Sequence, residues 1–533
     1  MIRDLNGLNG ILQVDADVCV VGGGMAGLLI ADKLKRCGVR AIVLESGDVA
    51  STPHANELND VVSASRPYVG ATLGRSRRLG GTSSIWGGSL IPFLEQDLEE
   101  RAHLGLRKWP ISLADIAEDI RDVESVFGVS HSAYDSDQVV EASIGAGAVA
   151  HDGDFVLRCA KWPPFGRLNV AQLLAQSLKS QTGVLIWVNA TVTSIEASTE
   201  SGRASDVVAR SPSGGELRVS ALRVVLCGGA IETTRLLLLL DRQTNGAAFR
   251  GCRALGKYFF DHLSMPAANL QPRDLTLLNR MAGYRWEGNT MRSLRFELAP
   301  STQLATGSPS SFGHIAMETE TTTPLDILRD AFRGYQRTGQ VRLGGLTPLF
   351  NEFGYLIRAG MWRAFNKRLL WPAGAKCSLH IVSEQIPREQ NSITLAEARD
   401  FYGIPRPRID WSVTSADTSS ILAYARRFDG YWKRSTWQRA GELQWNMRLD
   451  REMLDVPVMD KVVDIFHPGG TTRMGFDSVD AVVDRDLSVF AVPNISIAST
   501  SVFPAGASAN PSLTLMALSL RLARHLAKKF GRA

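Results

Sequence analysis

The chain has 533 residues, of which 44% are hydrophobic and 21% charged; this is an ordinary globular composition, long enough for two domains and a buried cofactor. Its 59 basic and 54 acidic residues give a net charge of +5 and are interspersed, with no run of five like charges. Disorder and nucleic-acid binding are therefore not expected.

The six cysteines are scattered without C-x-x-C spacing, and at least Cys19 and Cys227 lie in apolar, strand-like runs. This pattern indicates buried thiols in a reducing compartment. The first residues lack the build of a signal peptide, and no stretch reaches 18 uninterrupted apolar residues, so we expect a cytoplasmic protein. The nine histidines form no familiar zinc-binding array, and no metal site is expected.

A complete β-α-β pattern lies near the N-terminus, in DADVCVVGGGMAGLLIADKLKRCGVRAIVLESG (residues 15–47). Residues 17–21 indicate a buried strand, and residues 28–36 have the apolar spacing of a helix. Residues 40–44 indicate a second strand. The order predicts a nucleotide-binding unit, because the turn between the first strand and the helix is built of glycines.

Three of these glycines, Gly22, Gly24 and Gly27, give the spacing G-x-G-x-x-G. The first permits a tight turn, the second lets a pyrophosphate approach the main chain, and the third lets helix and strand pack closely. Glu45 follows 18 residues after Gly27, where a carboxylate can accept hydrogen bonds from an adenosine ribose. It favours FAD or NAD over NADP. A plain glycine turn is the alternative, which the complete surrounding pattern disfavours.

The loop RSRRLGGTSSIWGGSLIPF (residues 75–93) is too glycine-rich for a helix or central strand and offers many free backbone N–H groups. A loop of this kind can wrap a flavin pyrophosphate and lie against the ring. With this loop following the first motif, the chain resembles the glucose–methanol–choline (GMC) oxidoreductase family. Residues 225–239 (VLCGGAIETTRLLLL) and 482–529 resemble later segments of that family, so the resemblance extends from Asp17 to Lys529. The W-G-G and N-P motifs look most like its pyranose oxidase and glycoside 3-dehydrogenase branch.

The resemblance implies an α/β fold (α+β overall) with a Rossmann-like FAD-binding domain that is discontinuous in sequence, residues 1–260 and 461–533. Residues 261–460 are expected to form a second, mainly β-sheet domain that lines the substrate pocket. Strand-like alternation is evident in residues 293–300, 377–387 and 391–395.

The family pattern implies FAD as the cofactor. The expected cofactor-binding residues are Gly22, Gly24, Met25, Ala26, Gly27, Glu45, Ser46, Arg78, Gly80, Gly81, Thr82, Ser83, Trp86, Gly87, Gly88, Val192, Gly228, Ser499, Pro511 and Thr514. Members resembling the pyranose branch can attach flavin to a histidine in the glycine-rich loop, but that position here is Ile85. An aliphatic side chain cannot form the bond, so we expect tight, non-covalent FAD.

The segment DIFHPGGTTRMG (residues 464–475) contains His467, which is either a structural turn residue or a catalytic base. Flavin-dependent alcohol oxidation needs a base for the hydroxyl proton, and imidazole, with a pKa near 6.5, suits that task. Asn510, 43 residues later, can hold the substrate oxygen by its amide. Both residues fall on the family's His/Asn pair, which favours catalysis. Each is followed by a proline, which restricts its backbone, and the helix expected after Pro511 points a positive dipole end at the flavin.

Residues 325–371 form a basic amphipathic insertion. Its cationic residues are Arg329, Arg333, Arg337, Arg342, Arg358, Arg363, Lys367 and Arg368. We interpret it as a helical lid or oligomer contact whose arginines face solvent; adsorption to an anionic membrane is the less favoured alternative.

These features predict FAD-dependent oxidation of a secondary hydroxyl of a sugar or glycoside to the ketone, with the proton taken by His467 and hydride transferred to flavin N5. Oxidation of a lipid or other non-sugar alcohol, and a non-redox role such as lyase chemistry or structural flavin binding, are the alternatives. The electron acceptor, whether oxygen, a quinone or a carrier protein, is left open by the sequence.

Overall fold

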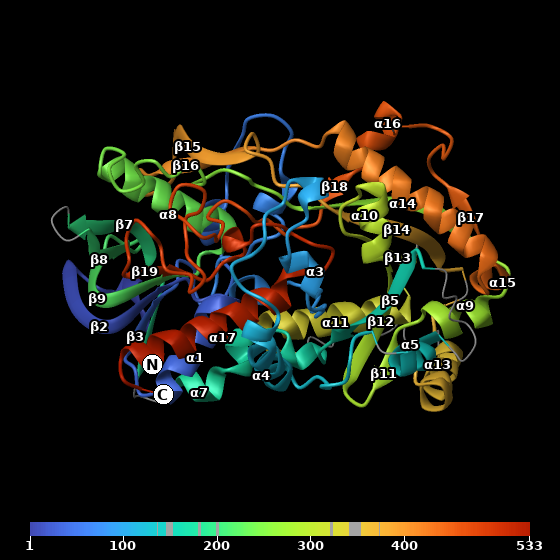
Figure 1. Cartoon of the computed structure of the whole chain (residues 1–533). Helices are drawn as coiled ribbons and strands as arrows, with labels where there is room; N and C mark the ends of the chain where they lie inside the picture. The colour runs from blue at the N-terminus through green and yellow to red at the C-terminus, as the bar shows by residue number, and fades with distance from the viewer. Residues whose placement is uncertain are drawn as a thin grey trace.

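In a computed structural model the chain forms two large β-sheets with helices packed around them (Figure 1). The structure describes all residues except 136, 145–152, 180–182, 199–201, 320–322, 341–352, 373, 453 and 533. The expected α/β fold class is confirmed.

The first sheet, on the left in Figure 1, has the strand order β1-β6-β3-β2-β9-β8-β7, and β19 also pairs with β9. These strands are β1 (Ile2–Asp4), β2 (Ile11–Val21), β3 (Ala41–Leu44), β6 (Val184–Val188), β7 (Thr191–Ser198), β8 (Arg203–Arg210), β9 (Glu216–Leu226) and β19 (Ile495–Ile497). The neighbouring strands β1, β6, β3, β2 and β9 run parallel to one another. Strand β8 is antiparallel to both of its neighbours, β9 and β7. Val21, Leu44 and Leu226 are in register, so three strand ends meet at one edge, the place where open α/β sheets bind ligands.

The predicted β-α-β unit is confirmed, with α1 (Met25–Arg36) beginning three residues earlier than the apolar pattern indicated. Gly24 caps this helix. An added Cβ at Gly27 would lie 2.0 Å from the carbonyl oxygen of Gly22, so only glycine allows this close approach. Helix α1 packs against α17 (Pro511–Lys529), which in turn contacts α4 (Ala117–Phe127). The strand and helix expected in residues 225–239 are β9 and α8 (Gly229–Gln243).

The second sheet, on the right in Figure 1, is antiparallel with the order β11-β12-β13-β14-β10-β17. Two further strands join it, β18 beside β10 and β5 beside β12. Its strands are β5 (Phe155–Trp162), β10 (His262–Pro272), β11 (Arg285–Glu287), β12 (Thr290–Leu298), β13 (Ser311–Glu318), β14 (Lys376–Glu384), β17 (Gly441–Trp445) and β18 (Val463–Asp464). Helix α14 (Ser415–Arg434) packs on β14 and buries Phe428 and Tyr431. Strand β5 reaches this sheet from the part of the chain that precedes residue 261.

One strand lies elsewhere than expected. Residues 391–395 were expected to join the substrate sheet, but they belong to a three-stranded sheet of β15 (Ser392–Arg399), β16 (Pro405–Asp410) and β4 (Val62–Ser63). Helix α8 packs on this small sheet. Alternation shows that a strand has two different faces, but it does not show which strand is the neighbour.

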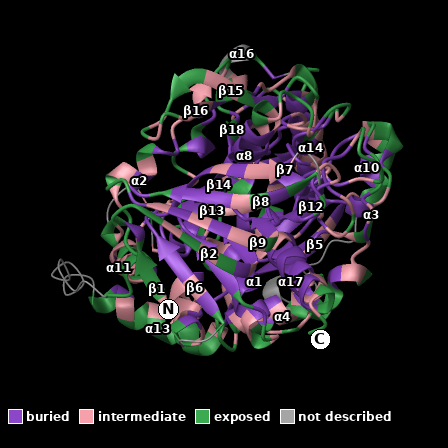
Figure 2. Cartoon of the chain, turned by 90° about the vertical axis from the view of Figure 1, so that its left-hand side faces the viewer, coloured by how far each residue is buried: buried purple, intermediate pink, exposed green. Residues whose placement is uncertain are grey.

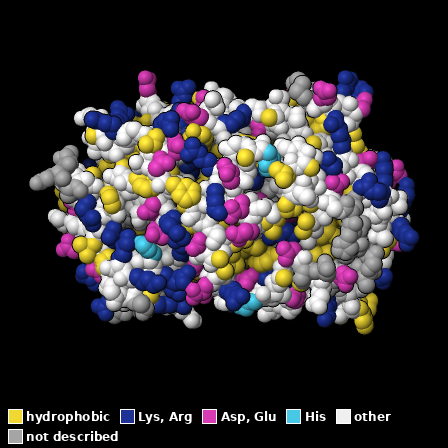
Figure 3. All heavy atoms as spheres, in the orientation of Figure 1, with side chains coloured by type: hydrophobic (Ala, Val, Ile, Leu, Met, Phe, Trp, Pro, Cys, Tyr) yellow, Lys and Arg dark blue, Asp and Glu magenta, His cyan; other side chains and the backbone are white. Residues whose placement is uncertain are grey.

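The remaining helices are short or peripheral. They are α2 (Pro53–Glu57), α3 (Glu95–Leu98), α5 (Asp137–Ile144), α6 (Val170–Leu173), α7 (Ala175–Lys179), α9 (Leu275–Ala282), α10 (Pro300–Thr306), α15 (Trp437–Ala440) and α16 (Val456–Met459). Figure 2 shows that the buried residues follow the sheet strands and their covering helices through the interior. Cys19 and Cys227 are buried, as predicted. On the face drawn in Figure 3, acidic and basic side chains are interspersed.

The basic insertion contains α11 (Pro324–Thr338) and α13 (Phe353–Asn366), while Arg342 lies outside the described residues. Gln336 of α11 is buried and donates to the carbonyl oxygens of Ser83 (3.1 Å) and Trp86 (3.0 Å), so α11 packs on the glycine-rich loop. Arg368 is buried, contrary to the expectation that the arginines of this insertion face solvent. Where the structure describes the chain, no helix is long and apolar enough to cross a membrane.

Candidate active site

A cavity lies where the ends of β2, β3 and β9 meet the glycine-rich loop and the segment around His467. Twelve of the expected cofactor-binding residues line it. They are Gly22, Gly24, Met25, Ala26, Glu45, Ser46, Gly81, Thr82, Val192, Gly228, Ser499 and Pro511. The structure thus gathers, around one cavity, residues that are spread over almost five hundred positions of the sequence.

Three helices begin at this cavity: Met25 of α1, Gly228 at the cap of α8 and Pro511 of α17 all line it. The first backbone N–H groups of a helix have no partner within the helix and carry a partial positive charge. Such ends bind phosphate groups and stabilise negative charge. At Gly24 an added Cβ would meet only the Cα of Gly81, at 4.0 Å, so the turn leaves backbone open to the cavity. These features fit the diphosphate and ring of FAD.

Glu45 is buried at the end of β3, where its two carboxylate oxygens accept hydrogen bonds from the backbone N–H groups of Gly23 and Gly47, both at 2.8 Å. Burial raises the pKa of this carboxyl, and the two backbone donors oppose the rise. The sequence indicated Glu45 as a ribose partner. The structure adds that it also fixes the two turns beside the cavity, while each oxygen keeps a lone pair for a ligand hydroxyl.

Eight expected cofactor-binding residues do not line this cavity. They are Gly27, Arg78, Gly80, Ser83, Trp86, Gly87, Gly88 and Thr514. Several of them shape the loop instead. Ser83 accepts the N–H of Val170 at 3.0 Å, and Trp86 donates its indole N–H to the Leu168 carbonyl at 3.0 Å. Gly80 and Gly88 have φ angles of +92° and +93°, which favour glycine.

Of the other residues in this group, Arg78 donates to the carbonyl of Val49 at 2.7 Å, and an added Cβ on Gly87 would contact Trp162. The hydroxyl of Thr514 is buried in α17 without a hydrogen-bond partner among the described residues. The side chain of Ile85 is 37% exposed and does not line the cavity.

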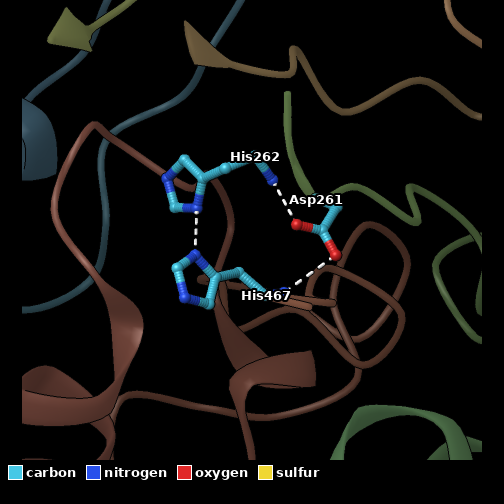
Figure 4. A group of neighbouring side chains, drawn as sticks. All are labelled: Asp261, His262 and His467. Atoms are coloured by element: carbon cyan, nitrogen blue, oxygen red, sulfur yellow. Dashed lines mark hydrogen bonds between the residues drawn. The ribbon is translucent and has the colours of Figure 1, made fainter. Parts of the chain in front are cut away.

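Asp261 and His262 hold His467 at its backbone and at one ring nitrogen (Figure 4). Its backbone N–H donates to Asp261 at 2.8 Å, and its Nδ1 lies 2.9 Å from Nδ1 of His262. On the other side its Nε2 lies 3.3 Å from the amide nitrogen of Asn510. The predicted His/Asn pair is therefore in direct contact in the structure.

The hydrogen bonds assign the tautomers of the two histidines. Nε2 of His262 lies 2.7 Å from the carbonyl oxygen of Ala507, which can only accept, so this nitrogen carries a proton. A neutral His262 then has its lone pair on Nδ1, and His467 must donate its Nδ1–H there. The lone pair of neutral His467 is consequently on Nε2, the nitrogen that faces Asn510.

The amide of Asn510 is oriented in the same way. Nη2 of Arg295 donates to Oδ1 of Asn510 and also to the hydroxyl of Ser89 at 2.9 Å. Because the amide oxygen of Asn510 accepts from Arg295, the NH₂ group of Asn510 is directed to Nε2 of His467. The amide can therefore donate a hydrogen bond to an oxygen atom placed beside that nitrogen.

A second cavity lies on the other side of this pair, lined by Asn510, Arg295 and strands of the second sheet. His467 lines the first cavity and Asn510 lines the second. The two residues that line the different cavities are therefore in contact with each other, at 3.3 Å.

Electrostatics keep His467 neutral. Burial lowers its pKa well below 6.5, and the neighbouring His262 and Arg295 lower it further. A neutral imidazole is the form that accepts a proton. Asp261, His262 and His467 are close enough together to resemble a metal-binding cluster. Their donor atoms, however, already bond one another, Tyr68 and Ala507, which fits a hydrogen-bond network rather than a metal site.

Sequence reasoning missed Asp261, His262 and Arg295. Asp261 and His262 stand side by side at the start of β10, and two adjacent polar residues opening a buried strand were a usable signal. Arg295 gave none, because it is one of two arginines in an ordinary alternating strand.

The chain is similar to several known proteins. The family profile described as GMC oxidoreductase matches residues 387–519. The chain is 22% identical to 2-methyl-1,2-propanediol dehydrogenase of Mycolicibacterium austroafricanum, over 97% of this chain and 96% of that protein. It is 30% identical to a C-glycoside 3-oxidase of Arthrobacter globiformis over 152 residues, 28% of this chain and 27% of that protein.

Solved structures show the same fold. Pyridoxine 4-oxidase from Mesorbium loti superposes with a TM-score of 0.59 at 17% identity, covering 96% of this chain and 99% of that one. A formate oxidase structure has a TM-score of 0.60 at 15% identity, covering 98% and 100%. Together with the family profile over residues 387–519, these likenesses show that the chain is similar to GMC oxidoreductases and support an FAD-dependent oxidoreductase that acts on CH–OH groups.

Proposed function

We propose that this enzyme oxidises a secondary hydroxyl of a sugar or glycoside to the ketone. The observation that carries the proposal is the lone pair of His467 Nε2, which faces Asn510 at the junction of the two cavities. A carbinol placed there has a base for its hydroxyl proton and an amide donor for its oxygen.

When bound, FAD supplies the acceptor for the hydride that leaves the carbinol carbon. The chain's own groups do the rest. Nε2 of His467 takes the hydroxyl proton, and the Nδ1–H bond to His262 holds the resulting imidazolium in place. The NH₂ group of Asn510 donates to the substrate oxygen as it becomes a carbonyl. Fixed orientation matters here, because small displacements of the reacting atoms slow the transfer strongly.

The residues that we propose to hold FAD are those of the first cavity, with Glu45 toward the ribose and the starts of α1, α8 and α17 toward the diphosphate and ring. Because Ile85 is aliphatic, we propose that the cofactor is held without a covalent bond.

A sugar ring suits the second cavity. Trp162, Tyr284 and Trp437 supply aromatic faces, while His314 and His380 supply uncharged hydrogen-bonding groups. Burial lowers the pKa of His314 to about 3 and also lowers that of His380, so both are neutral near pH 7. The likeness to a C-glycoside 3-oxidase supports this substrate class.

A non-sugar alcohol is the second candidate, favoured by the likeness of the whole chain to a propanediol dehydrogenase. The two candidates share the same base and the same amide donor and differ in what fills the second cavity.

The test is anaerobic mixing of the purified holoenzyme with sugars, glycosides and small diols while the flavin absorption is followed. His467→Ala should keep FAD and a normal melting temperature, yet reduce its flavin about 10²–10⁴-fold more slowly. Exposed His103 provides the matched control, since His103→Ala should react like the wild type. A His467→Ala variant that reduces its flavin at the wild-type rate would remove this residue from the mechanism.

A further inference from the structure

The second cavity contains a buried cation with no anion beside it. Arg295 is 5% exposed and lines the cavity from β12. Among the residues that the structure describes, it forms no ion pair: Nη2 bonds the neutral groups of Ser89 and Asn510, and Nη1 has no hydrogen-bond partner. The centroid of the Phe312 ring lies 4.2 Å from the guanidinium carbon, and the carboxylate of Glu297 acts on Arg295 without a direct contact.

The acids in this region are already paired. Glu297, two residues along β12, accepts from Arg158 at 2.9 and 3.2 Å. Glu384 accepts two hydrogen bonds from Arg101, at 2.6 and 2.8 Å. None of the described residues lining the cavity is an aspartate or glutamate. A buried, unpaired charge is costly, and charged residues are rarely buried without a partner.

The position of this cation is specific. Because Nη2 bonds the catalytic-pair amide of Asn510, the guanidinium lies next to the point where the carbinol would react. Guanidinium matches a carboxylate by paired, charge-assisted hydrogen bonds. The cavity has a volume of about 330 Å³, enough for a small organic acid.

A second unpartnered polar atom lines the same space. Nδ1 of His314 is buried with no hydrogen-bond partner among the described residues. Since this imidazole is neutral, it suits a hydroxyl group rather than a second anion. The cavity therefore offers one place for a carboxylate and another for a hydroxyl.

We propose that the substrate is a hydroxy acid, such as a sugar acid, whose carboxylate pairs with Arg295 on or near the carbon that carries the reacting hydroxyl. This inference rests on the proposed function, which it refines by naming the charge of the substrate. The carbinol is oxidised as described above, and the carboxylate itself undergoes no chemical change.

Carboxylate binding is tested first, without any reaction. The holoenzyme is titrated with benzoate and with benzamide, which have nearly the same shape but differ in charge, and the shift in flavin absorption is followed. Benzoate should bind at least about tenfold more tightly than benzamide. This preference should disappear in Arg295→Met and be partly kept in Arg295→Lys.

The control is Arg273→Met, which removes an arginine whose side chain is 60% exposed and should leave the preference unchanged. FAD content and melting temperature show whether each variant is folded. Equal affinities for the two probes in the wild type, or a preference that survives in Arg295→Met, would overturn the proposal.

The second measurement is anaerobic flavin reduction by gluconate and by gluconamide. Arg295→Met also loses the contact that orients Asn510, so both rates should fall. The informative quantity is the ratio of kcat/KM for the acid to that for the amide. It should be at least about tenfold in the wild type and close to one in Arg295→Met. If the ratio is the same in the wild type and in Arg295→Met, Arg295 only orients Asn510 and does not bind the carboxylate.

The outcomes separate the two proposals. Reduction by neutral sugars with no preference for benzoate supports the proposed function and contradicts the hydroxy acid. Arg295-dependent benzoate binding with no reduction by sugars or sugar acids supports a carboxylate site and contradicts the proposed function.

Discussion

His262 and His467 are hydrogen-bonded through their Nδ1 atoms at 2.9 Å, although 205 positions separate them in the chain. One ring comes from the first residue of the substrate-side strand β10, and the other from the segment after β18. The bond directs the lone pair of His467 away from His262 and toward Asn510, so His262, which lines neither cavity, selects the tautomer of the proposed base.

This relationship predicts a positioning role for His262. His262→Phe removes the acceptor for the Nδ1–H of His467, and anaerobic flavin reduction should become about 10- to 100-fold slower with FAD still bound. His262→Asn keeps an acceptor oxygen near the position of Nδ1 and should recover part of the rate. If the two variants react equally slowly, the loss comes from packing rather than from the tautomer.

The reaction should stay fast at mildly acidic pH. An ordinary imidazole would give a rate that rises through pH 6.5, but burial, His262 and Arg295 hold the pKa of His467 well below that value. The base is then neutral at pH 6.5, and the flavin-reduction rate should fall only at lower pH, as protonation removes the lone pair. Stopped-flow traces between pH 5 and 8 measure this.

The variant Arg295→Met tests the direction in which Arg295 shifts the pKa of His467. Arg295→Met removes one of the cations that lower the pKa of His467, so its rate profile should shift to higher pH. A wild-type profile with its midpoint at or above 6.5 would contradict a neutral His467.

Acid treatment should release intact FAD to the supernatant, because Ile85 offers no atom for a covalent bond and its exposed side chain lies outside the cavity. The measurement is the flavin absorption of the two fractions after precipitation. Flavin that stays with the precipitated polypeptide would show attachment at another residue.

Glu45→Gln should weaken FAD binding by about 1.5–3 kcal/mol, since it removes the charge from hydrogen bonds to a ribose and to the N–H groups of Gly23 and Gly47. Titration of apoprotein with FAD measures the loss. Glu442→Gln, at a side chain that is 62% exposed, is the control and should bind FAD normally. Unchanged affinity in Glu45→Gln would place the ribose elsewhere.

Glu384→Ala should destabilise the fold by about 3–5 kcal/mol, because it leaves the buried guanidinium of Arg101 without its partner. Glu384 also accepts the N–H of Ala507 at 2.9 Å, and Ala507 supplies the carbonyl that fixes His262. Denaturant unfolding measures the change. Asp450→Ala, which breaks an exposed pair with Arg448, should leave the free energy of unfolding close to that of the wild type.

The nucleotide-binding turn and the last helix could be predicted from the sequence. Gly22, Gly24 and Gly27 are required by local backbone geometry, and the apolar spacing after Pro511 is that of a helix. Such features depend on neighbours within a few residues, so their signal is local. The pairing of His467 with Asn510 was also predictable, but only through the resemblance to a family.

The rest of the site depends on contacts between distant segments. Arg295 reaches Asn510 only because β12 lies beside the start of α17, and His262 meets His467 only because β10 pairs with β18. The strand of residues 392–399 lies in a small separate sheet, which is likewise decided by contacts between distant segments. Alternating side chains indicate the faces of a strand but not its neighbour, so tertiary packing alone decided which charges surround the base and how the second cavity is lined.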